Sequence, residues 1–338
     1  MPKTQNPHVR NWLYTFAAVV AFLVVFGGFV RLTRSGLSIV EWNPAGGIVP
    51  PIGTEAWQAE FSKYQQTPEY QQVNFNMTLP QYQSIFYIEW IHRLLARLAG
   101  FLYAIPLLYF VARRTIPLRE VGAYAFIGLI FVGQAFAGWY MVASGLLDRP
   151  AVSHLRLTIH LLIALALLFL SLWIALGHQY GFNRADFRSG LLGPSVAAFI
   201  LLLLQITYGG LTAGLKAGHL SDTWPLMFGK LVPADLLPSP DAAVGSPLAV
   251  LFIHRWLAFL GLLAVFLLYW YARKHEPRRA FRRGIGWIAG LATAQVLVGI
   301  LTTVGHMQLP LALLHQANAV LLFAAAAACL YRIAASRN

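Results

Sequence analysis

Four histidines inside long apolar stretches are the residues of this sequence best suited to chemistry. They are His92, His160, His254 and His315. Ionisable side chains within a membrane are costly and usually functional, and we expect each of these within about two turns of the start of its helix. Two imidazoles from facing helices can supply both axial positions of a haem iron, whereas zinc prefers about four ligands at one centre. The pattern therefore predicts two haem sites with two histidine ligands each.

The remaining histidines have no such role in our interpretation. His154 lies at a helix boundary, and we expect it at the membrane interface. The others fall in tails, loops or helix ends and are expected to be solvated, namely His8, His178, His219, His275 and His306.

The surroundings of the four central histidines differ between the two halves of the chain. Glu89 precedes His92 by three residues, so both lie on one face of a helix. The position three residues before His254 holds Leu251 instead. A carboxylate beside only one site predicts a catalytic role for Glu89, as a proton relay or as the stabiliser of a cationic intermediate. The alternative is a structural ion pair between Glu89 and Arg93 on the next turn.

An arginine directly follows the first of these histidines in each half, as Arg93 and as Arg255. Arginine pairs well with carboxylates, so both residues are candidate partners of haem propionates. The alternative is that the two side chains reach toward lipid headgroups.

The composition indicates an all-α integral membrane protein. Of its 338 residues, 58% are hydrophobic and 11% are charged, against about 45–50% and about 25% in soluble domains. Eight apolar stretches are long enough to cross a bilayer as helices, and none has the alternating pattern of barrel strands. These stretches cover residues 12–31, 84–112, 121–145, 153–177, 190–214, 247–272, 284–305 and 309–332.

The positions of lysine and arginine predict how the chain lies in the membrane. Many of the 25 cations fall in short segments on one side, which is typical of the cytoplasmic side. Both termini are therefore expected in the cytoplasm, and the haem sites toward the outer face. The net charge of +13 then indicates contact with anionic lipid, and no nucleic-acid partner is predicted. The cations on this side are Lys3, Arg10, Arg113, Arg114, Arg119, Arg184, Arg188, Arg273, Lys274, Arg278, Arg279, Arg282, Arg283, Arg332 and Arg337.

Polar motifs recur in the same order in the two halves. The pairs are Gly27-Gly28 with Gly209-Gly210, Glu41-Trp42-Asn43-Pro44 with Thr223-Trp224-Pro225, His92-Arg93 with His254-Arg255, Gln134 and Gly138 with Gln295 and Gly299, and His160 with His315. They predict a duplicated four-helix unit, so that two pseudo-symmetric four-helix bundles make up the chain. We assign residues 1–183 to the N-terminal repeat and residues 184–338 to the C-terminal repeat. The single cysteine, Cys329, excludes a disulfide within the chain.

Taken together, several motifs resemble the haem A synthase family along nearly the full length of the chain. They are Gly27 to Ser38 (GGFVRLTRSGLS) with the following Glu41-Trp42, Glu89 to Arg93 (EWIHR), Gly138 to Leu146 (GWYMVASGL), Arg156 to Leu161 (RLTIHL), Thr223 to Met227 (TWPLM), His254-Arg255 and His315-Gln316. Some family members carry a cysteine pair in an outer loop. The outer loops here contain no cysteine, so the chain resembles the subgroup without that pair.

The resemblance implies a bacterial inner-membrane enzyme that oxidises the C8 methyl group of haem O to a formyl group through hydroxylated intermediates, which supplies haem A to terminal oxidases. It implies that His92 and His160 flank the substrate haem O, with Glu89 as the catalytic carboxylate. It also implies that His254 and His315 ligate a cofactor haem b. Haem O synthase and oxidase assembly factors are the protein partners that it suggests.

Two other functions remain open on the residues alone. A membrane electron carrier of the bis-histidine cytochrome b type explains the four histidines equally well, but it does not explain Glu89 beside one site only. A transporter explains the repeat, although the polar residues lie toward one face and not at the midplane. The long connection over residues 32–83 is expected either to cap the outer site or to rest as a folded loop on the bundle.

Overall fold

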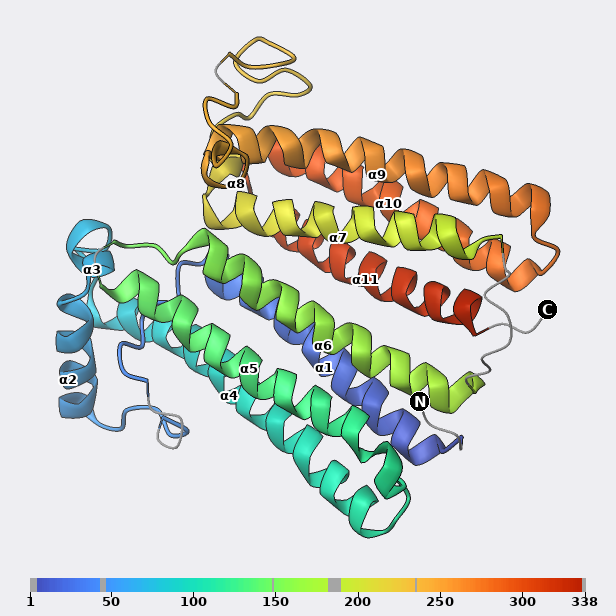
Figure 1. Ribbon diagram of the computed structural model, residues 1–338. Helices are drawn as coiled ribbons and strands as arrows, with labels where there is room; N and C mark the ends of the chain where they lie inside the picture. Colours follow the sequence, from blue (N-terminus) through green and yellow to red (C-terminus); the bar gives the residue numbers. More distant parts are fainter. Residues whose placement is uncertain (1–4, 43–46, 148, 182–189, 235, 336–338) are drawn as a thin grey trace. The chain divides into compact units, whose positions relative to one another are not determined.

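Helices make up nearly all of the regular structure. The computed structural model describes residues 5–42, 47–147, 149–181, 190–234 and 236–335, and within these ranges one isolated bridge, between Met227 and Lys230, is the only pairing of extended chain. Eight helices of the described chain are long and apolar enough to cross a membrane, which confirms the predicted class. They are α1 (Pro7–Leu32), α4 (Leu79–Ala112), α5 (Val121–Leu146), α6 (His154–Tyr180), α7 (Leu192–Gly214), α9 (Pro247–His275), α10 (Arg279–Val304) and α11 (Leu309–Ala334), as Figure 1 shows.

Helix α4 begins before the apolar stretch that predicted it, because a polar cap and a proline extend its first turn. Thr78 and Gln81 form a capping box, and α4 starts at Leu79 instead of the predicted residue 84. Helix α9 begins at its predicted residue, Pro247, and Ser246 caps it by accepting a hydrogen bond from the backbone N–H of Ala249. Capping residues are polar, so a search for apolar stretches does not include them.

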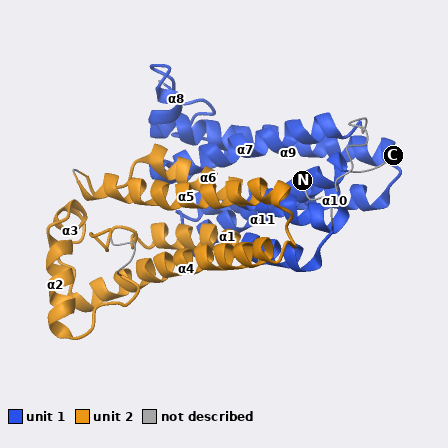
Figure 2. Ribbon diagram, turned by 60° about the horizontal axis from the view of Figure 1, so that its bottom comes forward, with its two compact units in different colours: residues 1–17, 168–338 blue, residues 18–167 orange. Residues whose placement is uncertain are grey.

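The helices form two compact units, coloured separately in Figure 2. Unit 1 comprises residues 1–17 and 168–338, and unit 2 comprises residues 18–167. The division falls inside α1 and α6. The predicted repeat boundary between residues 183 and 184 lies outside the described residues, as do Lys3, Arg184, Arg188 and Arg337. The two-repeat assignment therefore stays a prediction.

Unit 1 contains a four-helix bundle in which α7 and α10 each contact both α9 and α11. Its interior is apolar, and small residues such as Ala289 and Ala292 of α10 allow the helices to approach closely. The connection between α7 and α9 contains two short turns of helix, η2 (Ala217–His219) and α8 (Ala242–Gly245).

Unit 2 contains α4, α5 and the adjoining parts of α1 and α6. The Tyr103 hydroxyl of α4 donates a hydrogen bond to the backbone carbonyl of Tyr124 at the start of α5, at 2.6 Å. Phe131 of α5 packs against Gly100 of α4. Helices α4 and α5 are thereby held side by side over several turns.

The long connection between α1 and α4 folds into α2 (Thr54–Gln65) and α3 (Pro68–Gln72). An aromatic cluster of Trp57, Tyr64, Tyr82 and Phe86 joins α2 to the first turns of α4, and all four side chains are buried. The segment is therefore a folded loop that rests on its own bundle, which was one of the two expectations from the sequence. Its role as a cap over the outer site stays a prediction.

Candidate functional site

In unit 2, the two predicted histidines lie against glycines of neighbouring helices. A β-carbon built on Gly27 of α1 would lie 3.2 Å from Nε2 of His92, and one built on Gly138 of α5 would lie 2.9 Å from Cε1 of His160. These distances are shorter than ordinary van der Waals contacts. Only glycine therefore leaves each ring its present place. The two imidazoles are also close enough to interact electrostatically, so the fold brings the pair together.

In unit 1, the same arrangement recurs for the second pair. A β-carbon built on Gly209 of α7 would lie 3.2 Å from Cε1 of His254, and one built on Gly299 of α10 would lie 2.9 Å from Cε1 of His315. The two imidazole centroids are 6.4 Å apart, and the ring planes are nearly perpendicular. The predicted pairing of the histidines, two per half, agrees with this geometry.

Each pair supplies only two ligands, so it suits a metal whose remaining ligands belong to a cofactor. Among the described residues, no group of three or more His, Cys, Asp and Glu side chains is arranged to hold a metal ion. A metal bound by two imidazoles at about 2 Å each separates their ring centroids by roughly 6 Å, close to the observed 6.4 Å in unit 1. Two axial imidazoles are also a donor set that haem iron accepts. The residues present therefore fit a haem.

Glu89 is buried and holds several donors at once. Its Oε2 accepts hydrogen bonds from the backbone N–H of Ser38 (2.8 Å), the Ser38 hydroxyl (2.7 Å) and the backbone N–H of Ile39 (3.0 Å). Its Oε1 accepts two from Arg93, from Nε at 3.0 Å and from Nη2 at 2.6 Å. The ion pair foreseen as an alternative role is thus present. The donors fix the position of the carboxylate and tie the segment after α1 to α4.

Arg93 also holds the outer segment of unit 2. Beyond Glu89, its guanidinium donates to the backbone carbonyl of Ile39 at 3.1 Å and to that of Glu41 at 3.5 Å. The side chain thus binds the backbone that follows α1, and neither lipid headgroups nor propionates are needed to explain its position.

Arg255 makes the matching contacts in unit 1. Its guanidinium donates to the backbone carbonyls of Ser221 at 2.7 Å and Thr223 at 3.1 Å. Glu41 and Thr223 occupy equivalent positions in the repeated motif, so the two arginines hold equivalent carbonyls. Nε of Arg255 is buried without a hydrogen-bond partner among the described residues, and it is the atom that a carboxylate would still satisfy.

Two sequence interpretations need correction. His178 was expected to be solvated, but it is 5% exposed and its Nδ1 accepts a hydrogen bond from the backbone N–H of Asn6. The second interpretation placed each of the four central histidines within about two turns of the start of its helix. His160, His254 and His315 lie six or seven residues after the first residue of their helices, within about two turns, whereas His92 lies thirteen residues after Leu79. The capping box that extends α4 is the reason.

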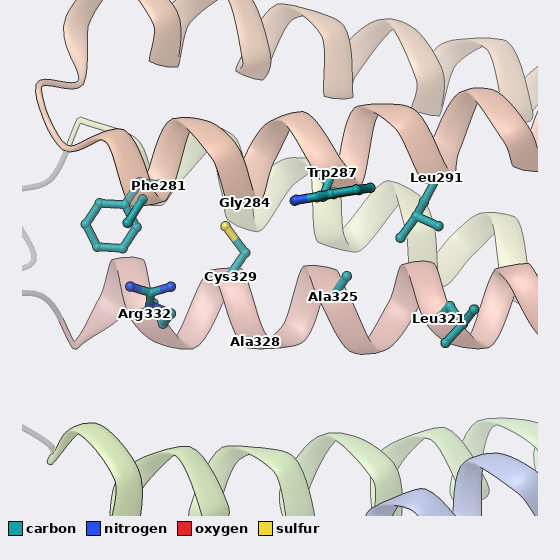
Figure 3. A pocket seen from close by; sticks show the side chains of 10 residues that line it. Phe281, Gly284, Trp287, Leu291, Leu321, Ala325, Ala328, Cys329 and Arg332 are labelled. Carbon is teal, nitrogen blue, oxygen red and sulfur yellow. The ribbon is translucent and has the colours of Figure 1, made fainter.

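An apolar pocket of about 440 Å³ lies between α10 and α11 of unit 1, and Figure 3 shows its lining side chains. Trp287, Cys329 and Arg332 are among them, and no histidine is. We therefore do not assign this pocket to the histidine pair of the same unit.

Sequence reasoning missed the residues that surround the predicted ones. Ser38 stands in a stretch that resembles the family, but nothing in the pattern identified it as a donor to Glu89. Gln205 lies four residues before Gly209, and its amide Nε2 is 3.1 Å from Nδ1 of His254. The recurring spacing of a glutamine four residues before a glycine was the available signal.

Known proteins resemble this chain along nearly its full length. Residues 10–327 match the COX15-CtaA family, described as cytochrome oxidase assembly protein. The chain is 40% identical to the heme A synthase of Maricaulis maris over 326 residues, which is 95% of each chain. It is 41% identical to the heme A synthase of Mesorhizobium japonicum over 331 residues, covering 95% of this chain and 89% of that relative. The resemblance noted in the motifs is thereby confirmed, and this chain belongs to the haem A synthase family.

Proposed function

We propose that this chain is a haem A synthase, which oxidises the C8 methyl group of haem O to a formyl group through hydroxylated intermediates and supplies haem A to terminal oxidases. The observation that carries the proposal is the difference between two otherwise matched histidine pairs. A buried carboxylate, Glu89, lies one turn from His92, whereas Leu251 occupies the equivalent position before His254. Membership of the family supports the same conclusion.

The two pairs would then have different tasks. His92 and His160 would hold haem O as the substrate, while His254 and His315 would hold a haem b. When bound, haem b would accept and pass on the electrons that leave the substrate. Arg255 keeps one unpartnered buried N–H, which makes it the better candidate for a propionate than Arg93.

Glu89 would act on the substrate by its charge. Oxidation of a methyl group removes hydride or hydrogen-atom equivalents and leaves the carbon electron-poor. A carboxylate whose position is fixed beforehand by Ser38, Ile39 and Arg93 stabilises such developing positive charge without having to reorganise. The same hydrogen bonds favour this electrostatic role over that of a proton acceptor, because the carboxylate oxygens are already occupied.

The enzyme would lie in the bacterial inner membrane with both termini in the cytoplasm and the histidine pairs toward the outer face. The clustering of cations in short segments supports this orientation. Residues 1–183 and 184–338 would be the two repeats. The matching carbonyl contacts of Arg93 and Arg255 support the duplication. Haem O synthase and oxidase assembly factors are the proposed protein partners.

The product test is mass spectrometry of haems extracted from cells that make haem O synthase, with and without this protein. We expect a haem with the mass of haem A, or of its hydroxymethyl precursor, only when the protein is present. If the purified protein carries haem while the extract contains only haem B and haem O, it is an electron carrier and the proposal is wrong.

Single histidine replacements test the assignment of the two pairs. His254→Ala is expected to lower the affinity for the resident haem b by about 100-fold or more, because a ligand and not merely its hydrogen-bonding partner is lost. The same replacement at His160 is expected to leave that haem in place and to abolish haem A formation. Absorption spectra of the purified proteins and haem extraction check both. Equal loss of haem b in the two variants would contradict the division of tasks.

A further inference from the structure

Arg31 is a cation of unit 2 whose guanidinium has no partner within the described part of the chain. It belongs to the last turn of α1 and is half-buried. Among the described residues, its side chain makes neither a hydrogen bond nor an ion pair, and no carboxylate interacts with it. Arginine carries five N–H donors, and donors that are removed from water need acceptors. Arg31 is therefore available to an anion that comes from outside the chain.

The position of Arg31 along α1 places it next to the histidine pair of unit 2. Gly27, against which His92 packs, precedes Arg31 by four residues, so both lie on one face of α1. Ser38, shortly after the end of α1, donates to Glu89 at 2.7 Å, which puts the end of α1 and Glu89 at the same end of the unit. Arg31 and Glu89 thus each lie about one helical turn beyond the level of the His92 imidazole.

The other arginine that follows this histidine pair in the motif is already occupied. Nε and Nη2 of Arg93 donate to Glu89, Nη2 donates also to the backbone carbonyl of Ile39, and Nη1 donates to that of Glu41. All three nitrogens of Arg93 therefore have acceptors within unit 2. An anionic ligand of this unit finds unsatisfied donors at Arg31 instead.

Unit 1 has its unsatisfied donor on a different helix. There Nε of Arg255, in α9, is buried without a partner among the described residues. The position that corresponds to Arg31, four residues after Gly209 in α7, holds Ala213. Each unit thus offers one arginine to an anion, but the two arginines occupy positions that the repeat does not relate.

Haem is an anion of the required kind. Its two propionates are carboxylates, and arginine binds carboxylates through two parallel N–H donors. Two axial histidines hold only the iron, so the porphyrin can still turn about the iron–nitrogen axis. A contact at the edge of the ring, one helical turn from the ligating imidazole, stops that rotation.

We propose that Arg31 binds a propionate of the haem in unit 2 and thereby sets the orientation of that haem about its axial ligands. The inference rests on the proposed function, because it takes haem to be the occupant of unit 2. In haem O, the C8 methyl group and one propionate belong to the same pyrrole ring. A propionate held at Arg31 therefore keeps this methyl group at the end of the unit where Glu89 lies.

Haem with blocked propionates tests this contact without any measurement of activity. The full-length protein carries His254→Ala, which removes a ligand from unit 1, and is titrated in detergent with haem b or with haem b dimethyl ester. We expect Arg31→Gln to lower the affinity for haem b by about 10–100-fold, because a hydrogen bond between charged groups is lost. The affinity for the ester, which has no carboxylate, should stay within about twofold.

Arg34→Gln is the matched control. It removes the same charge three residues further along the chain, where the arginine is exposed. We expect this variant to bind both haem b and the ester within about twofold of the original affinity. Arg31→Lys keeps the charge but loses the paired donors, so it should recover only part of the affinity for haem b.

Three results would overturn the inference. Equal losses for haem b and its ester in Arg31→Gln would give Arg31 a structural role, and an unchanged affinity for haem b would leave it to a lipid headgroup. A loss of the same size in Arg34→Gln would reduce the effect to net charge. Failure of the proposed function looks different, because haem A is then absent from extracts of cells making the original protein, whatever the titrations show.

Discussion

Replacing Glu89 with glutamine is expected to lower haem A formation by about 100-fold or more, while the haem b proposed for unit 1 stays bound. The substitution keeps the size of the side chain and removes its charge. Removal of one preorganised electrostatic group from an active site typically costs about 10²–10³ in rate. The measurement is haem A produced per amount of protein, together with the absorption spectrum of the purified variant.

The structure makes a control necessary, because Glu89 also anchors the segment after α1. Its loss leaves the Arg93 guanidinium without a counter-charge, and breaking a buried pair typically costs about 3–5 kcal/mol. Ser38→Ala removes one donor to Glu89 and weakens the same anchor, but keeps the charge. We expect that variant to retain haem A formation within about tenfold, because the carboxylate keeps its charge and its other donors. The lost hydrogen bond to a charged group contributes about 1.5–3 kcal/mol to stability, so its loss weakens the anchor.

The two variants together separate charge from anchoring. If Ser38→Ala loses as much haem A formation as Glu89→Gln, the carboxylate acts by anchoring the segment after α1 and has no direct part in the reaction. Normal haem A formation by Glu89→Gln would remove Glu89 from the catalytic role altogether.

Adding one methyl group at Gly299 or Gly138 is expected to disable one histidine pair and spare the other. A β-carbon at either position would lie 2.9 Å from Cε1 of the facing imidazole. Overpacking of this kind costs about 1–3 kcal/mol, and a displaced ligand lowers metal affinity by about 10–100-fold. Gly299→Ala should therefore release haem b from unit 1. Gly138→Ala should abolish haem A formation and leave haem b bound.

Matched controls lie on the same helices. A β-carbon added to Gly290 of α10 or to Gly133 of α5 would meet nothing within 4 Å, so alanine fits at both positions without a clash. Alanine also favours a helix over glycine by up to about 1 kcal/mol. Gly290→Ala and Gly133→Ala should thus bind haem as the original chain does, as measured by haem titration. Normal haem binding by Gly299→Ala would mean that the imidazole of His315 can shift away from the added methyl group and still ligate the haem.

Much of the fold could be predicted because its signals are local and add along the chain. Every one of the eight predicted spans corresponds to a helix that can cross a membrane. An apolar stretch of sufficient length reports its own environment, whatever its neighbours are. The starts of the helices were less accurate, as at α4, because a capping box of polar residues lies outside the apolar signal.

The pairing of the histidines and the position of Glu89 could also be anticipated from the sequence. The recurring motif places His92 and His254 at matching positions. A spacing of three residues puts Glu89 on the face of His92 whatever the tertiary fold. These relations need only helix geometry. They hold before any helix packs against another.

Tertiary structure alone decided what surrounds these side chains. Glu89 meets Ser38 across 51 residues of sequence, and Arg255 meets Ser221 across 34. Which glycine faces a ring, and whether a glutamine stands beside it, depends on how each helix is rotated against its neighbour. That rotation is set by the packing of whole helix faces, so no local stretch of the sequence contains it.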